Sequence, residues 1–193
     1  VGIQSGSERV CKEVYHRPWM PDETIKLSEM LSKFPLKQVQ YEVITNSVFE
    51  TDDDRRETLE FLLKLYRPFD IELFGLVVYP ICALIYEKPL VDHIDEKNLL
   101  FWNMLYHLTG VNGVDKDYIR ELSTNSYLRE HPEELEKFVI AVTTIHKERR
   151  QLEWEKHQLN KALSFQQTEQ QPGVRDLVKK ALRKAKLSLL PLR

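Results

Sequence analysis

The feature that most restricts the fold of this chain is a strand–helix alternation that repeats about every 35 residues over its first two thirds. Residues 1–4 have the character of a strand end, residues 39–45 alternate apolar and polar side chains, and residues 71–79 are almost continuously apolar. Amphipathic patterns of helical period lie between them. A β-α-β-α-β order at this spacing predicts a parallel sheet, with the apolar third strand buried on both faces.

Local start signals predict where the intervening helices begin. Ser5 and Glu8 have the S-x-x-E spacing of a capping box. Asp22 is expected to cap the second helix. Thr51 precedes three aspartates at residues 52–54, which is the order that a capped helix N-terminus and its dipole favour.

From residue 96 onwards the pattern is helical. Residues 99–108 predict a buried helix, residues 115–129 an amphipathic helix and residues 132–167 one long helix. Apolar positions expected to reach a core from the long helix are Leu135, Phe138, Val139, Ile145, Leu152, Leu159 and Leu163, and its charges are interpreted as a solvated face. We therefore divide the chain into an α/β part (1–95), a helical extension (96–171) and a basic tail (172–193).

Composition and charge exclude several classes of function. The 28 basic and 30 acidic residues give a net charge of −2, which provides no global field for nucleic acid. No apolar run approaches the roughly 18 residues of a membrane span. Two cysteines form no disulfide framework, and with no signal peptide at the start we expect a cytoplasmic protein. Because Val1 falls within a strand pattern, we expect that a preceding part is missing.

Polar residues follow each predicted strand. Residues 2–7, GIQSGS, place small residues between a strand and a helix, where backbone N–H groups can bind an anion, although such a turn more often only closes a βα connection. Asn46 and Glu50 follow the second strand, at the edge of a parallel sheet where ligands gather. They are equally consistent with a turn that precedes a helix cap. Tyr79 ends the third strand, and Cys82 beyond it is interpreted as an inert buried thiol.

Three of these segments match known motifs in order and spacing. They are residues 1–10 (VGIQSGSERV) with 15–17 (YHR), residues 41–51 (YEVITNSVFET), and residues 69–80, which begin FDI and end YP. Together they resemble the elements at the fourth, fifth and sixth barrel strands of radical S-adenosylmethionine (SAM) enzymes, especially those with an N-terminal cobalamin-binding domain. The match covers about the first 90 residues. Val48, Ile81 and Cys82 depart from the family pattern, which usually has Pro, Gly and Thr there.

The resemblance implies a partial TIM-type barrel, the second half of a (β/α)6 barrel with about three parallel strands, followed by the helical extension. In that family a [4Fe-4S] cluster cleaves SAM reductively, giving a 5′-deoxyadenosyl radical that abstracts hydrogen from a substrate. It implies that Gln4, Ser5 and Ser7 lie near the ribose and methionine of SAM. It also implies that Arg17 approaches the SAM carboxylate, and that Ile44, Asn46, Glu50 and the backbone at Tyr79 form the adenine side.

The family's cluster-binding C-x-x-x-C-x-x-C motif is absent from this chain. The resemblance therefore implies that the cluster, and cobalamin if it binds, are held by a missing N-terminal part, and that the main partner is the missing half-barrel. This chain alone is not expected to catalyse, and the small-molecule or peptide substrate is not specified. The alternative interpretation is a non-catalytic α/β interaction module whose helical, basic tail binds a partner.

Overall fold

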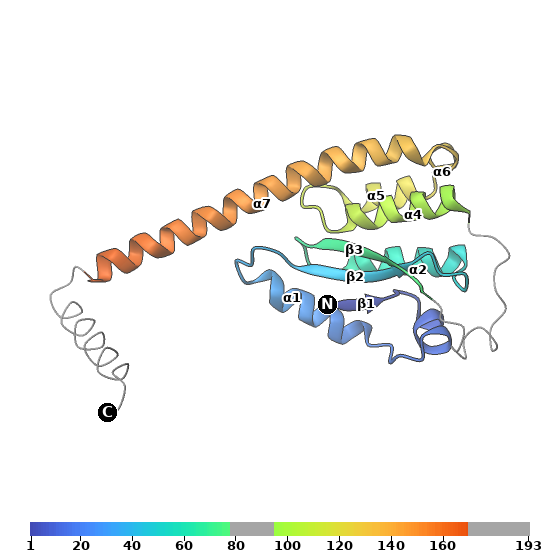
Figure 1. Cartoon of the computed structure of the whole chain (residues 1–193), viewed down its shortest axis with the longest axis horizontal. Helices are drawn as coiled ribbons and strands as arrows, with labels where there is room; N and C mark the ends of the chain where they lie inside the picture. Colours follow the sequence, from blue (N-terminus) through green and yellow to red (C-terminus); the bar gives the residue numbers. More distant parts are fainter. Residues whose placement is uncertain (78–94, 170–193) are drawn as a thin grey trace, which may run out of the picture. The chain divides into compact units, whose positions relative to one another are not determined.

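The computed structural model describes residues 1–77 and 95–169, with side chains described up to residue 161 (Figure 1). Val1–Arg149 forms one compact unit, and a second unit begins at Arg150. The predicted third-strand ending, with Tyr79 and Cys82, and the basic tail lie outside the described residues.

A parallel sheet forms the centre of the first unit. Within the described residues it has three strands in the order β1-β2-β3, namely β1 (Gly2–Gln4), β2 (Gln40–Thr45) and β3 (Asp70–Gly75). Gln40 pairs with Asp70 and Thr45 with Gly75 in continuous register, whereas the register shifts between β1 and β2. The predicted α/β class with about three parallel strands is confirmed.

The two faces of the sheet differ in burial. Tyr41 and Val43 of β2 are buried beside Ile71 of β3, because helices cover this face. Side chains on the second face are half-buried or exposed, and Glu42 lies in register with Glu72 there. The expectation that the third strand is buried on both faces was wrong for the described part of β3, since Glu72 and Phe74 are exposed.

The first helices show which start signals operate. Thr51 caps α2 (Asp52–Lys64) through the predicted contact and forms a full capping box with Asp54. The two other predicted caps were wrong. The short π-helix η1 (Val10–Val14) has no side-chain cap, and α1 (Pro21–Ser32) begins one residue before Asp22 because proline suits the first helical position.

The helical extension begins with α4 (Glu96–Thr109), which confirms the predicted buried helix. The single helix expected over residues 115–129 is instead two, α5 (Lys116–Ser123) and α6 (Ser126–Glu130). The chain breaks there because the Asn125 side chain accepts the Leu128 N–H and starts a new helix. The long helix is confirmed as α7 (Pro132–Glu169). None of the described helices combines the length and apolarity needed to cross a bilayer.

Within the first unit, α4 and α6 pack on the sheet and on α2 through apolar and polar contacts. Phe101 and Trp102 of α4 belong to the same buried cluster as Tyr41 of the sheet. At the start of α2, the Asp52 carboxylate accepts hydrogen bonds from Asn98 Nδ2 (2.5 Å) and Trp102 Nε1 (3.2 Å), and pairs with Arg129. Figure 1 shows α1 beside β1 and α4 beside β3.

The predicted core positions of α7 divide into two groups. Leu135 and Val139 are buried in the core of the first unit, as expected. The remaining four with described side chains are exposed, with relative exposures of 40% for Phe138, 50% for Ile145, 65% for Leu152 and 60% for Leu159. Their assignment to a core was therefore wrong, and Leu163 lies beyond the described side chains.

Candidate functional site

The loops that follow β1 and β2 meet at the carboxyl edge of the sheet. Ser5 Oγ donates a hydrogen bond to Glu50 Oε1 at 3.2 Å, which joins the two loops directly. The loop after β1 is also fixed to α2, because Ser5 Oγ lies 3.2 Å from Thr58 Oγ1 and the Gly6 N–H donates to the same oxygen at 2.9 Å. All four residues are buried. This end of the sheet is therefore a closed polar network rather than a row of separate turns.

A second part of the network centres on Asp54 in the first turn of α2. Ser7 Oγ donates to Asp54 Oδ1 at 2.8 Å. Arg9 donates to both Asp54 oxygens, at 3.0 and 2.5 Å, and to the Phe49 carbonyl at 2.7 Å. Because Thr51 also donates to Asp54, one carboxylate orders the segment after β1, the segment after β2 and the start of α2.

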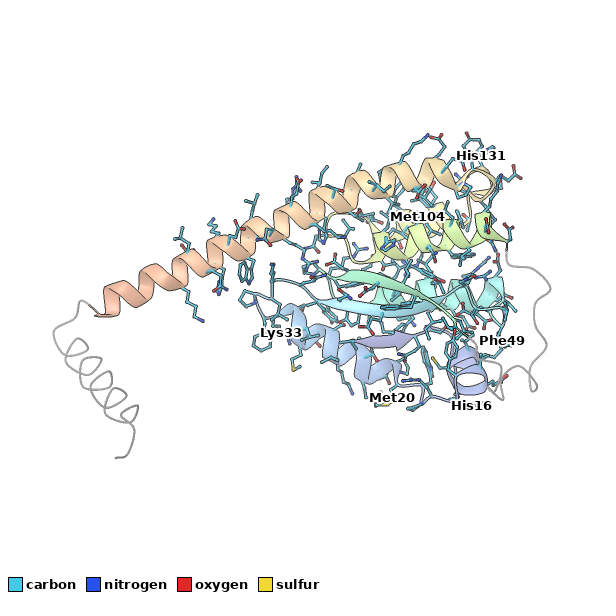
Figure 2. The ribbon with its side chains drawn as sticks, viewed as in Figure 1. His16, Met20, Lys33, Phe49, Met104 and His131 are labelled. Carbon is cyan, nitrogen blue, oxygen red and sulfur yellow. The ribbon has the colours of Figure 1, made fainter. Side chains whose placement is uncertain are left out.

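Phe49 gives this network an apolar support. It packs with Val10 and Val14 of η1 in a small buried cluster separate from the main core. Figure 2 shows Phe49 at the end of the sheet where η1 lies. The contact holds the loop after β2 against the helix that follows the loop after β1.

The two carboxylates of the network have opposite electrostatic environments. Burial raises the pKa of Glu50 to about 7, and Arg55 and the Ser5 hydrogen bond offset this only in part. Burial also opposes ionisation of Asp54, but hydrogen bonds from Arg9, Thr51 and Ser7 outweigh it and lower its pKa to about 2. Asp54 is thus a fixed anion at neutral pH, whereas Glu50 can gain or lose a proton there.

Asp54 should make stability depend on acid pH. Its folded pKa of about 2 lies below the ordinary aspartate pKa of 3.8, so its contribution is complete above pH 3.8 and is lost as pH falls toward 2. The difference corresponds to about 2 kcal/mol of unfolding free energy. We expect Asp54→Asn to lower the unfolding free energy by about that amount at pH 7 and to flatten its decline below pH 4. Urea unfolding across pH measures both effects, and the exposed neighbour Asp53→Asn is the matched control. Equal behaviour of the two variants would contradict the role given to Asp54.

Gln4 and Arg17 line a different feature, a pocket of about 330 Å³ between β1, the segment before α1, and α1 itself. Its wall is both apolar and charged. Trp19 and Phe61 supply aromatic surface, with ring centroids 5.4 Å apart, and Glu23 supplies a carboxylate. Arg17 is exposed, and its backbone N–H donates to the Cys11 carbonyl at 2.8 Å. The pocket offers a guanidinium and an amide beside an apolar surface.

Two strands end in residues with left-handed backbone conformations. Gln4 at the end of β1 has φ +65° and Asn46 just after β2 has φ +61°. Such values are uncommon for residues other than glycine, and they concentrate where backbone geometry serves a site. Asn46 is exposed, and Ile44 is half-buried on the second face of the sheet.

The structure thus distributes the residues that the sequence singled out. It brings Ser5, Ser7 and Glu50 into one buried network and Gln4 and Arg17 into one pocket, whereas Ile44 and Asn46 belong to neither. Sequence reasoning missed Arg9, Asp54 and Thr58 as parts of the site. Of these three, only Asp54 had a signal in the local sequence, because it lies in the first turn after the Thr51 cap. That signal predicted the start of a helix and not a role in the site.

The described residues hold no cluster of three or more side chains suited to a metal ion. Cys11 is buried, its Sγ donates to the Ser5 carbonyl at 3.2 Å, and burial raises the pKa of its thiol. It is therefore a poor nucleophile at neutral pH.

In comparisons with known proteins, the chain matches no protein-family model, no curated protein and no solved structure.

Proposed function

We propose that this chain is the C-terminal half of a radical SAM barrel and supplies part of the surface that binds SAM. The observation that carries the proposal is the hydrogen bond of 3.2 Å between Ser5 and Glu50. It joins the two segments that resemble successive motifs of that family, at the carboxyl edge of a parallel sheet, where α/β proteins bind ligands. The contact makes the two motif-bearing segments neighbours at this edge, as the proposed barrel requires of successive strands.

The second face of the sheet supports the same proposal. Parallel sheets normally have both faces covered, yet here Glu72 and Phe74 are exposed in the described part. Gln40 Nε2 donates to Glu72 across the strands, so this face carries ordered polar groups beside the apolar Phe74. In a barrel, this face would turn inward, and the missing half-barrel would close the space in front of it.

The accessible donors of this chain suit a nucleoside and an amino acid carboxylate. The amides of Gln4 and Asn46 can donate and accept hydrogen bonds, and the Arg17 guanidinium can pair with a carboxylate. Ser5 and Ser7 would act differently, because their hydroxyls are engaged with Glu50 and Asp54 and serve to shape the loop.

The [4Fe-4S] cluster does not fit this chain alone. The sequence contains two cysteines, fewer than the thiolates such a cluster needs. Its ligands, the reductive chemistry it supplies to bound SAM, and any cobalamin site would therefore belong to the missing part. The role proposed for Gln4, Asn46 and Arg17 of this chain is to bind and orient SAM.

Isothermal titration calorimetry of the chain with SAM tests the proposal. Because this chain would supply only part of the site, we expect weak binding with a dissociation constant on the order of 1 mM. Arg17→Ala should weaken SAM binding about fivefold and leave adenosine binding unchanged, since the guanidinium would contact only the carboxylate. Arg56→Ala, at an exposed arginine of α2, is the matched control. The proposal would be contradicted if no SAM bound at a concentration about 10-fold above the expected dissociation constant. It would also be contradicted if Arg17→Ala and Arg56→Ala had equal effects on SAM binding.

The alternative function, a non-catalytic interaction module, is favoured by a separate observation. Large apolar side chains are exposed along α7, from Phe138 to Leu159. A module of this kind should bind no SAM, so the same titration distinguishes the two functions.

A further inference from the structure

The exposed apolar residues of α7 have a regular spacing. Phe138, Ile145, Leu152 and Leu159 follow one another at intervals of seven residues, and each is at least 40% exposed. Seven residues are close to two helical turns, so these side chains form one stripe along the helix. A stripe of this length and composition is costly to leave in water.

Charged residues repeat at the same interval. Residues 148–154 read ERRQLEW and residues 155–161 read EKHQLNK, so acidic, basic, basic, glutamine and leucine positions recur in order. With Leu152 and Leu159 at the d positions of a heptad, Arg149 and Lys156 occupy the a positions and Glu148 and Glu155 the g positions before them. A basic residue at a core position of a coiled coil lowers its stability but favours a defined register and a small number of helices.

We infer that the part of this stripe from Ile145 to Leu159 is the seam of a parallel two-stranded coiled coil, which α7 forms with a second copy of this chain. The partner helix must present leucines seven residues apart and a glutamate beside each basic core position. A second copy meets both requirements by identity. The inference does not depend on SAM binding.

The charges favour the parallel orientation. In a parallel pair, Glu148 of one helix lies beside Arg149 of the other, and Glu155 lies beside Lys156, so each basic core residue has an acidic neighbour. An antiparallel pair would instead bring the g positions of both helices together and place Glu148 against Glu155. One repulsive contact remains in the parallel pair, between Glu148 and Glu153 of the other copy.

The expected dimer is weak and reversible. The interval from Ile145 to Leu159 is about 22 Å of helix, which is short for a coiled coil, and two of its core positions are charged. We expect a dissociation constant on the order of 10 μM for the whole chain.

Sedimentation equilibrium of the whole chain tests this inference. The expected result is a reversible dimer of the 22.9 kDa chain. The double variant Leu152→Ala/Leu159→Ala should raise the dissociation constant at least 20-fold. Gln151→Ala/Gln158→Ala, with the same spacing on another face of α7, should leave it unchanged. Because both leucines are exposed, circular dichroism and the urea midpoint should show that every variant folds normally.

A charge variant tests the orientation. Glu153→Lys should lower the dissociation constant several-fold, because a lysine there would pair with Glu148 across a parallel dimer. A monomer at 200 μM would overturn the inference. Dimerisation unaffected by the two leucine substitutions would overturn it as well, by assigning the contact to another surface. Weaker dimerisation of Glu153→Lys would overturn the parallel arrangement.

Discussion

Replacing Gly6 with alanine is expected to lower the free energy of unfolding by about 3 kcal/mol or more. A Cβ at this position would lie 2.4 Å from the Thr58 Cα and 2.9 Å from the Phe61 Cβ. The first contact is with backbone inside α2, so neither partner can rotate away. The substitution would also lengthen the hydrogen bond from the Gly6 N–H to Thr58 Oγ1. Urea unfolding at pH 7 measures the loss.

Gly75→Ala is the matched control for this substitution. The nearest atom to a Cβ at Gly75 is the Asn46 Nδ2 at 3.9 Å, an ordinary contact. We expect its unfolding midpoint to stay close to that of the unsubstituted chain. If Gly6→Ala is as stable as Gly75→Ala, the segment after β1 is not packed against α2 as the structure has it.

Glu50→Gln is expected to stabilise the chain by about 3 kcal/mol at pH 8. Burial raises the folded pKa of Glu50 from the ordinary glutamate pKa of 4.5 to about 7, so the folded state binds this proton more tightly than the unfolded state. Stability from this group is therefore complete below pH 4.5 and is lost as pH rises through 7. A neutral glutamine keeps an oxygen that can accept the Ser5 hydrogen bond and removes the cost of a buried charge.

Unfolding free energies at pH 4.5 and pH 8 provide the test. The two chains should differ little at pH 4.5, where Glu50 is largely protonated when folded, and most at pH 8. Glu57→Gln, at an exposed position of α2, should change neither value. A glutamine variant no more stable than the unsubstituted chain at pH 8 would show that Glu50 is not a desolvated carboxylate.

Local sequence signals predicted some helix starts correctly and others not. The capping box at Thr51 formed because its partner Asp54 is three residues away on the same helix. The equally good S-x-x-E spacing at Ser5 did not form a cap, since Ser5 is held by Glu50 and Thr58, more than 40 residues later. Contacts of that separation leave no periodic signal.

The candidate site shows the same division. The positions of Ser5, Ser7, Asn46 and Glu50 at strand ends followed from the strand–helix alternation. That Asp54 collects hydrogen bonds from Ser7 and Arg9 did not, because nothing in the local sequence links residues 45 or more positions apart. The heptad spacing of α7 was visible in the sequence, but whether its leucines face a core or water was not.

By itself, then, the sequence determined the α/β class, the alternation of parallel strands with helices and the long helix after residue 132, because apolar periodicity depends on neighbouring residues. The tertiary structure alone decided three further matters. Among the described residues, it left Glu72 and Phe74 exposed on one face of the sheet, enclosed Ser5, Ser7 and Glu50 in a buried network, and exposed Leu152 and Leu159. Each depends on which distant segments pack together, and burial and pKa follow from that packing rather than from the order of residues along the chain.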